Sequence, residues 1–326
     1  MQIFGLFCKT YRGDLERFKI LKNSVDKFNK DKVPFYVVCP AVDMGCFILL
    51  KNENEAYEYK VISDEELLGM GNEHHKQDWY SQQIIKLEFY KLKFLKHWLS
   101  LDSDCYFIRE FYIKDYLLDE NTPYIPLTEP MKGAESNFMQ LFRALRSKEE
   151  EQTWNIGAKN FLGRGGGSKR FCLNVPPVLS YEALLHMNDN LLRPKKMQFA
   201  DLIKIYPYEY EWYCDYLLKF KPIEFQICTP FFVSFYNETF YQLYRKLGFT
   251  EEILSNYYTG LIMHEGWIRD KKFRKSLFGS FVRKLLIIYF YWHEQKYPAK
   301  KERFSFKKFW KKYYTIPLQV FKNKKG

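Results

Sequence analysis

Leu99-Ser100-Leu101-Asp102-Ser103-Asp104 is an apolar segment that ends in two carboxylates. It predicts a short buried strand, and because side chains alternate along a strand, Asp102 and Asp104 are expected on one side with Ser103 on the other. Two carboxylates this close repel each other unless a cation lies between them. Oxygen ligands of this kind suit a hard divalent ion that also holds a diphosphate. The alternative is a solvated turn, because Asp and Ser are common turn residues.

The residues before this segment alternate between apolar runs and helical patterns. Strands are predicted at Ile3–Cys8, Val33–Cys39 and Tyr59–Ile62, with a helix from Leu15 to Phe28. This order predicts an α/β fold with a mainly parallel, Rossmann-like sheet flanked by helices. Such sheets bind ligands beyond the carboxyl ends of their strands. Thr10–Asp14, Asp43 and the Asp-x-Asp segment are therefore expected at one edge of the sheet.

The longest helical pattern runs from Gln77 to Trp98 and leads directly into the Asp-x-Asp segment. Trp79, Gln83 and Lys86 fall on one face of this predicted helix. A solvent-exposed lysine is the simplest interpretation of Lys86. Its apolar neighbours and its approach to an acidic strand make a lysine that faces phosphate or carboxylate groups an equal alternative.

Two later segments carry further candidate groups. Residues 206–216 combine Glu209 and Glu211 with Tyr and Trp. Aromatic rings can stack on sugars while carboxylates bind hydroxyls or accept a proton, although composition alone favours an amphipathic core helix. His264 follows an apolar run and is a candidate metal ligand, with a buried structural histidine as the alternative.

The formal net charge of the 326 residues is +12, and it is concentrated at the C-terminal end. Residues 271–326 contain 17 Lys and Arg against Glu294 and Glu302, so the preceding part is close to neutral. Basic residues interleaved with Phe, Leu, Tyr and Trp predict a helical tail that lies on an anionic membrane surface. A helix packed on the body and nucleic-acid binding are the alternatives, and the aromatic content favours membrane over nucleic acid. The expected domains are 1–270 and 271–326.

Several features point to a cytoplasmic location. The seven cysteines are scattered without a C-x-x-C pair, which suits reduced thiols. The N-terminus has no pattern of a signal peptide, and no apolar run reaches the ~18 residues that a membrane-spanning helix needs. The chain is expected to bind peripherally to the inner face of the cytoplasmic membrane.

Taken in order, these segments resemble a bacterial family of GT-A-fold glycosyltransferase-like proteins from surface polysaccharide and lipooligosaccharide biosynthesis. The matching segments are Tyr11-Arg12-Gly13-Asp14, Gln82-Gln83-x-x-Lys86-Leu87, Leu101-Asp102-Ser103-Asp104 and Glu209-Tyr210-Glu211-x-Tyr213-x-x-Tyr216. The resemblance covers about residues 3–217 and does not extend to His264 or the basic tail.

The resemblance implies a metal-dependent transfer of a sugar from a nucleotide-sugar, with a UDP-sugar as the expected donor, to a membrane-associated glycan or glycolipid. The donor is expected near Thr10, Tyr11, Arg12, Asp43, Gln83, Lys86, Asp102 and Arg164. Mn²⁺ or Mg²⁺ is expected on Asp102, Asp104 and His264. Glu209 or Glu211 is expected to act as general base in an inverting reaction, with Lys86 stabilising the leaving diphosphate.

Two other function classes remain open. A sugar nucleotidyltransferase uses a similar sheet and carboxylate pair, but it needs a Gly-rich loop after the first strand, and Cys8–Asp14 contains only Gly13. A non-enzymatic protein that binds membranes or nucleic acid through its basic tail would need no such site. In that protein the Asp-x-Asp segment would be a simple turn.

Overall fold

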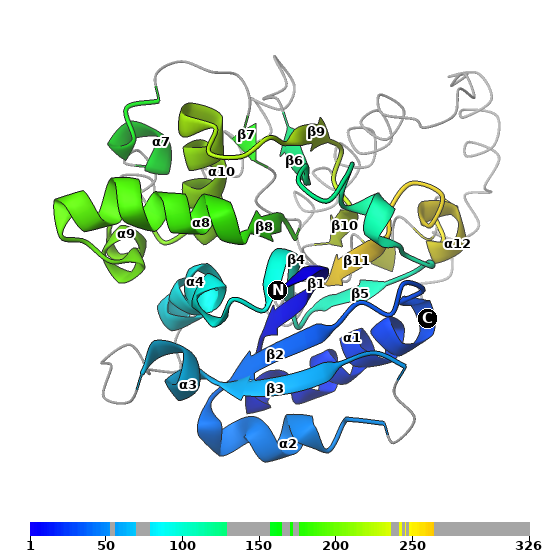
Figure 1. Cartoon of the computed structure of the whole chain (residues 1–326). Helices are drawn as coiled ribbons and strands as arrows, with labels where there is room; N and C mark the ends of the chain where they lie inside the picture. The colour runs from blue at the N-terminus through cyan, green and yellow to red at the C-terminus, as the bar shows by residue number, and fades with distance from the viewer. Residues whose placement is uncertain are drawn as a thin grey trace, which may run out of the picture. The chain divides into compact units, whose positions relative to one another are not determined.

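A computed structural model describes residues 1–52, 56–69, 79–128, 157–164, 170–171, 176–235, 241–242, 245 and 248–263 (Figure 1). Its central sheet has the strand order β3-β2-β1-β4-β8. The strands are β1 (Gln2–Lys9), β2 (Phe35–Cys39), β3 (Tyr59–Ser63), β4 (Leu95–Asp102) and β8 (Val178–Ser180). Strands β1 to β4 pair in parallel, and β8 is antiparallel to β4. The predicted α/β fold with a mainly parallel sheet is confirmed.

Helices cover both faces of this sheet (Figure 1). On one face lie α1 (Leu15–Phe28) and α2 (Met44–Ile48). On the other face lie α3 (Asp64–Leu68), α4 (Trp79–Glu88), α8 (Tyr181–Met187), α9 (Phe199–Ile205) and α10 (Glu209–Phe220). Alternate residues of β1 enter the two cores, since Leu6 and Cys8 pack on the α1 side while Phe7 packs on the α4 side. Strands buried on both faces read as continuous apolar runs, as the sequence does here.

Smaller elements surround the central sheet. One sheet has the order β10-β11-β5, with β10 (Phe232–Phe235), β11 (Gly260–Met263) and β5 (Cys105–Phe107). Another has the order β7-β6-β9, with β7 (Arg170–Phe171), β6 (Tyr124–Thr128) and β9 (Gln226–Cys228), and short helices form at α7 (Ala158–Phe161) and α12 (Glu251–Leu254). Strand β11 requires glycine at Gly260, because an added Cβ would lie 2.2 Å from the Phe232 ring.

Two expectations about the region around β4 are wrong. The helical pattern expected to reach Trp98 ends earlier, because Lys93 adopts a left-handed conformation with φ of 54° and β4 begins at Leu95. A strand buried on both faces lacks alternation, so periodicity alone does not distinguish it from a buried helix. The strand also ends at Asp102, which leaves Ser103 and Asp104 in a turn. Turn geometry, not strand alternation, therefore positions Asp104.

The remaining predicted elements agree with the structure where it describes them. Helix α1 spans the predicted residues, and Ser63 caps α3 by accepting a hydrogen bond from the backbone N–H of Glu66 at 2.9 Å. His264 and the basic tail at 271–326 lie outside the described residues, as do residues 165–169. In the part of the chain that the structure describes, no helix combines the length and apolar character needed to cross a membrane.

Candidate active site

The carboxyl ends of the parallel strands meet at one edge of the central sheet. Thr10 follows β1, Asp43 follows β2, Asp64 follows β3 and Asp102 ends β4. Parallel pairing places these positions side by side, with Lys9 of β1 opposite Asp102 of β4. The candidate groups expected from the sequence at this edge are therefore brought together by the fold.

The loop after β1 is held in place by a buried carboxylate. Asp43 is 5% exposed, and its Oδ2 accepts a hydrogen bond from the backbone N–H of Arg12 at 2.9 Å. The ring of Tyr11 lies over Gly13, where an added Cβ would approach it to 2.4 Å. Thr10 is buried, and no group among the described residues hydrogen-bonds its Oγ1. The loop thus offers a ring, an exposed Arg12 side chain and an unsatisfied hydroxyl.

A buried ion pair contacts the backbone of this loop. Lys9 Nζ lies 3.0 Å from Asp64 Oδ2 and donates to the backbone carbonyl of Thr10 at 2.9 Å. Since β2 separates β1 from β3, the pair reaches across the end of β2 and joins the central strand β1 to the start of α3, directly after β3. The sequence interpretation missed this pair. The available signal was a lysine directly at the end of the apolar first strand, where a buried charge needs a partner.

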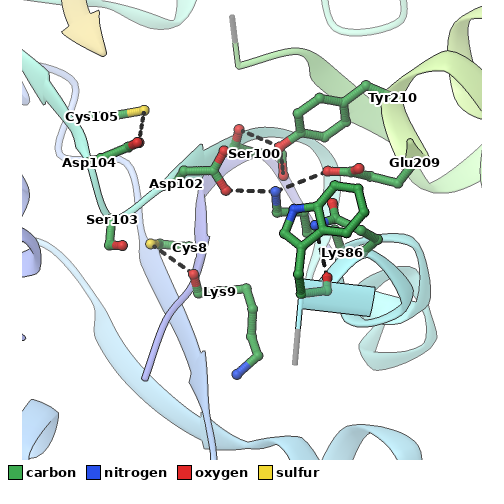
Figure 2. A network of polar contacts seen from close by, with 12 residues as sticks. Cys8, Lys9, Lys86, Ser100, Asp102, Ser103, Asp104, Cys105, Glu209 and Tyr210 are labelled. Atoms are coloured by element: carbon green, nitrogen blue, oxygen red, sulfur yellow. Dashed lines mark hydrogen bonds and ion pairs between the residues drawn. The ribbon is translucent and has the colours of Figure 1, made fainter. Parts of the chain in front are cut away.

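Lys86 of α4 lies at the centre of the polar network (Figure 2). Its Nζ lies 2.6 Å from Asp102 Oδ1 and 2.9 Å from Glu209 Oε1, and the residue is 3% exposed. Burial opposes the charged form, but the carboxylates of Asp102 and Glu209 outweigh it and raise the pKa of Lys86. The lysine is therefore a permanent cation that joins β4 to α10.

Glu209 and Tyr210 complete the α10 side of the network. Glu209 is 4% exposed, and burial raises its pKa while Lys86 opposes the rise. The hydroxyl of Tyr210 lies 3.2 Å from Ser100 Oγ and donates to the Ser100 carbonyl at 3.3 Å, which ties the helix to β4. The ring centroid of Tyr210 lies 4.9 Å from Lys86 Nζ, a cation–π contact.

Asp102 and Asp104 occupy different surroundings. Asp102 turns toward Lys86 and its side chain is 43% exposed, whereas Asp104 is half-buried beside Cys105 (Figure 2). Burial and then the negative charge of Asp102 raise the pKa of Asp104 to about 7, against smaller opposing effects of Lys86 and Arg17. Lys86 thus compensates Asp102 more fully than Asp104, and an additional cation beside Asp104 would be stabilised.

The carboxylates at the end of β4 are the described groups that could help to hold a metal ion. Among the described residues, no group of three or more His, Cys, Asp or Glu side chains is placed to hold an ion by itself. Asp102 and Asp104 nevertheless suit an ion that is bound by one or two carboxylates together with substrate phosphates, as Mg²⁺ commonly is. Met263, the last residue described before His264, donates its backbone N–H to the Asp104 carbonyl at 2.9 Å. His264 itself lies outside the described residues.

A protein-family model described as DUF6492, a family of unknown function, matches residues 3–265. The chain belongs to this family. The match covers the central sheet and every described group of the candidate site, and it ends before the basic tail. A search of curated proteins finds no match. Membership in DUF6492 therefore does not assign an activity to the chain.

Other expected site residues of this DUF6492 member contact different partners. Glu211 follows Glu209 by two helical positions, about 200° around the axis, and hydrogen-bonds Tyr206. Arg164 Nη2 forms an ion pair with Asp215 Oδ1 at 2.5 Å. Gln83 is buried one turn before Lys86 and donates to the Trp79 carbonyl at 3.0 Å. The donor-binding roles of Arg164 and Gln83 stay predictions.

Proposed function

We propose that this DUF6492 member is a metal-dependent glycosyltransferase with a GT-A-type fold. It would transfer a sugar from a nucleotide-sugar, with a UDP-sugar as the expected donor, to a membrane-held glycan or glycolipid. The observation that carries the proposal is the buried Lys86 between Asp102 and Glu209, at the carboxyl edge of a parallel sheet. Open α/β sheets bind their ligands at this edge, and a cation beside a carboxylate pair suits a diphosphate held with a divalent ion.

The loops after β1 and β2 support a site for the nucleoside. Tyr11 provides a ring for stacking on the base, and Arg12 provides an exposed guanidinium. Asp43 holds the backbone of Arg12 at 2.9 Å, and the buried hydroxyl of Thr10 has no hydrogen-bond partner among the described residues. These groups lie over β1 and β2, next to the Asp102 end of β4, so the diphosphate would extend toward Lys86 and Asp104.

The acidic groups at the end of β4 fit Mn²⁺ or Mg²⁺. Asp102 and Asp104 would hold the ion, and His264 is proposed as a further ligand because it follows Met263, whose backbone contacts Asp104. Bound there, the ion supplies positive charge for the leaving diphosphate. The raised pKa of Asp104, caused by burial and by Asp102, agrees with a site that lacks one positive charge.

The proposed chemistry assigns one role to Glu209 and another to Lys86. Glu209 accepts the proton of the acceptor hydroxyl as that oxygen bonds to the anomeric carbon, and the bond from this carbon to the diphosphate breaks. The electron pair stays on the diphosphate, where the charge of Lys86 stabilises it. Of the two expected bases, Glu209 is favoured because it faces Lys86, while Glu211 hydrogen-bonds Tyr206.

The shape of the first loop argues against a sugar nucleotidyltransferase. The ring of Tyr11 occupies the space beside Gly13, where it would lie 2.4 Å from an added Cβ. A phosphate-binding loop instead presents several backbone N–H groups around a Gly-rich turn. The loop of this chain is built around an aromatic ring, which suits a base and not a triphosphate.

Calorimetric titration of the protein with UDP and MnCl₂ tests the proposal. We expect UDP to bind in the presence of Mn²⁺ and to bind weakly with EDTA. Asp104→Asn should weaken metal-dependent binding by about tenfold or more. The matched control is Asp189→Asn, since Asp189 is a partly exposed side chain that pairs with Arg193 at 3.4 Å. Absence of UDP binding by the unchanged protein, or equal affinities of the two variants, contradicts the proposal.

The basic residues at 271–326 support a membrane surface as the location of the reaction. We propose that this tail binds anionic lipid at the inner face of the cytoplasmic membrane, so that the site meets a membrane-held acceptor. Each Lys or Arg near an anionic surface contributes about 1 kcal/mol. The tail is the main electrostatic contact, because its 17 Lys and Arg are opposed only by Glu294 and Glu302. The preceding residues are close to neutral overall.

A further inference from the structure

Trp79 and Tyr80 are large, solvent-exposed aromatic side chains at the start of α4. Trp79 is 44% exposed and Tyr80 is 50% exposed. Trp79 lies seven residues before Lys86, which is two turns and about 10 Å along the helix. Because α4 leads to the amino end of β4, it runs opposite to the strands. Trp79 therefore extends beyond the carboxyl edge of the sheet, further from the strands than Lys86.

The tertiary structure adds an aromatic ring from Tyr208, the residue directly before α10. Tyr208 packs edge-to-face on Trp79, with ring centroids 5.6 Å apart and an interplanar angle of 74°. Trp79 and Tyr80 meet at 5.4 Å and 72°, and Tyr206 supports Tyr208 at 5.1 Å. Contacts of this type fix the orientation of aromatic rings. The ring contacts thus fix the orientation of the cluster, while much of Trp79 and Tyr80 stays accessible to solvent.

A carboxylate lies directly beside these rings. Tyr206 hydrogen-bonds the partly exposed Glu211, whereas Glu209, which follows Tyr208, is buried and pairs with Lys86. An aromatic face binds the C–H face of a pyranose ring, and a carboxylate accepts hydrogen bonds from its hydroxyls. The combination suits a sugar better than an acyl chain, because an acyl chain would cover the partly exposed Glu211 carboxylate without offering it a hydrogen bond.

We propose that Trp79, Tyr80 and Tyr208 form a subsite that binds a pyranose ring of the acceptor. This inference rests on the proposed function, in which the reacting acceptor hydroxyl must reach Glu209. The sugar that carries the hydroxyl then lies against the residue before Glu209 and the ring that packs on it. The loops expected to hold the nucleoside follow β1 and β2, whereas this cluster joins α4 and α10. The acceptor is therefore a glycan whose terminal sugar stacks on Trp79.

Fluorine NMR of the full-length protein labelled with 5-fluorotryptophan tests this subsite. The probes are the methyl pyranosides of glucose, galactose and N-acetylglucosamine, and sorbitol is the acyclic control. Trp79→Phe identifies the Trp79 resonance. We expect at least one pyranoside to shift that resonance saturably, while sorbitol does not. Tyr80→Ala should weaken the binding by about tenfold, as loss of an aromatic contact does.

Controls separate this subsite from other occupants. Tyr257→Ala removes a 44% exposed ring elsewhere and should leave the pyranoside affinity unchanged. Tyr208→Ala gives a second test at the residue before α10, and Tyr80→Ala remains informative if that variant fails to fold. Absence of a saturable shift with every pyranoside overturns the subsite. An equal shift with sorbitol, or a shift only with dodecylphosphocholine micelles, overturns it too, the latter in favour of a lipid contact.

The outcome is distinguishable from a failure of the proposed function. Titration of Trp79→Phe with UDP and Mn²⁺ measures donor binding independently of the acceptor rings. Donor binding without pyranoside binding refutes the subsite alone. Pyranoside binding at Trp79 in a protein that binds no nucleotide supports the sugar-binding surface but contradicts the transferase.

Discussion

Lys86 carries a positive charge into a region that water barely reaches, and two carboxylates stabilise it there. Its side chain is 4% exposed, between Asp102 at 2.6 Å and Glu209 at 2.9 Å. Glu209 is as deeply buried as Lys86, so the two charges depend on each other. Removal of one member of such a group leaves an uncompensated buried charge, which is strongly destabilising.

Replacement of Lys86 by methionine should therefore lower the free energy of unfolding by about 3–5 kcal/mol. The measurement is urea denaturation followed by circular dichroism. The control is Lys19→Met, which breaks an exposed pair with Glu16 and should change stability by less than about 1 kcal/mol. Addition of Glu209→Gln to Lys86→Met should restore part of the loss, because the amide carries no charge. Equal stabilities of the two single variants would contradict the assigned role.

Gly13 sets the position of the Tyr11 ring, so a small change there tests the nucleoside site. Gly13→Ala places a Cβ within 2.4 Å of the ring and must displace it. We expect UDP affinity in calorimetry to fall by about tenfold, the value of one aromatic contact. Gly45→Ala is the control, because nothing lies within 4 Å of its added Cβ. Undiminished UDP affinity in Gly13→Ala would exclude Tyr11 from the site.

At the scale of elements, β4 connects the sheet to the candidate site. It pairs with β1 on one side and β8 on the other, and its last residue is Asp102. His97 within β4 contacts Ser180 Oγ of β8 through Nδ1 at 2.7 Å and the Glu120 carbonyl through Nε2 at 3.2 Å. A carbonyl only accepts, so Nε2 carries the proton and Nδ1 accepts from the Ser180 hydroxyl. The neutral ring thus ties β4 to its antiparallel neighbour.

This buried ring predicts a loss of stability in acid. Burial lowers the pKa of His97 from its ordinary 6.5 to about 4. Between these values the unfolded chain binds a proton that the folded chain excludes, so stability falls as pH drops from 6.5 toward 4. The full loss is about 3 kcal/mol. Urea denaturation at a series of pH values measures it.

The contribution of His97 is isolated by comparison with His97→Gln. That variant should be less stable near neutral pH but should lose less stability between pH 6.5 and 4. His186→Gln is a matched replacement of a partly buried histidine that contacts Tyr216. It should retain the acid-dependent loss of the unchanged protein. The same pH dependence in His97→Gln as in the unchanged protein would show that other groups cause it.

At the scale of the whole molecule, charge and family membership divide the chain at nearly the same place. The DUF6492 match ends at residue 265, and the strongly basic composition begins at Lys271. The family-matched part contains all described groups of the candidate site. The basic residues therefore lie outside the family-matched part, and the binding of anionic lipid that we propose for them can be tested separately.

Ending the chain after Arg269 should separate the two properties. We expect the shortened protein to keep its Mn²⁺-dependent UDP affinity and to lose flotation with vesicles that contain phosphatidylglycerol. Full-length protein should float with these vesicles, less so at high salt, and should not float with neutral phosphatidylcholine vesicles. Vesicle binding by the shortened protein would place the lipid contact in residues 1–269.

Local sequence is sufficient for much of this fold. The apolar runs of β1, β2 and β3 and the spacing of α1 predict the parallel sheet, because burial on both faces requires continuous apolar strands. The same property misleads at β4, whose residues from Leu95 to Trp98 read as a continuation of α4. Pairing with β1 decides their conformation, and pairing is a long-range effect that a local pattern does not contain.

Residue type and spacing were enough to identify the candidate groups, namely the Asp-x-Asp segment, Lys86, Asp43 and Glu209. Which of these groups meet follows from the packing of strands and helices. That packing brings Lys86 between Asp102 and Glu209, which are 107 residues apart along the chain, and directs Glu211 toward Tyr206. A buried charge needs a partner, and because the partner can be distant in sequence, a local pattern does not reveal which one it is.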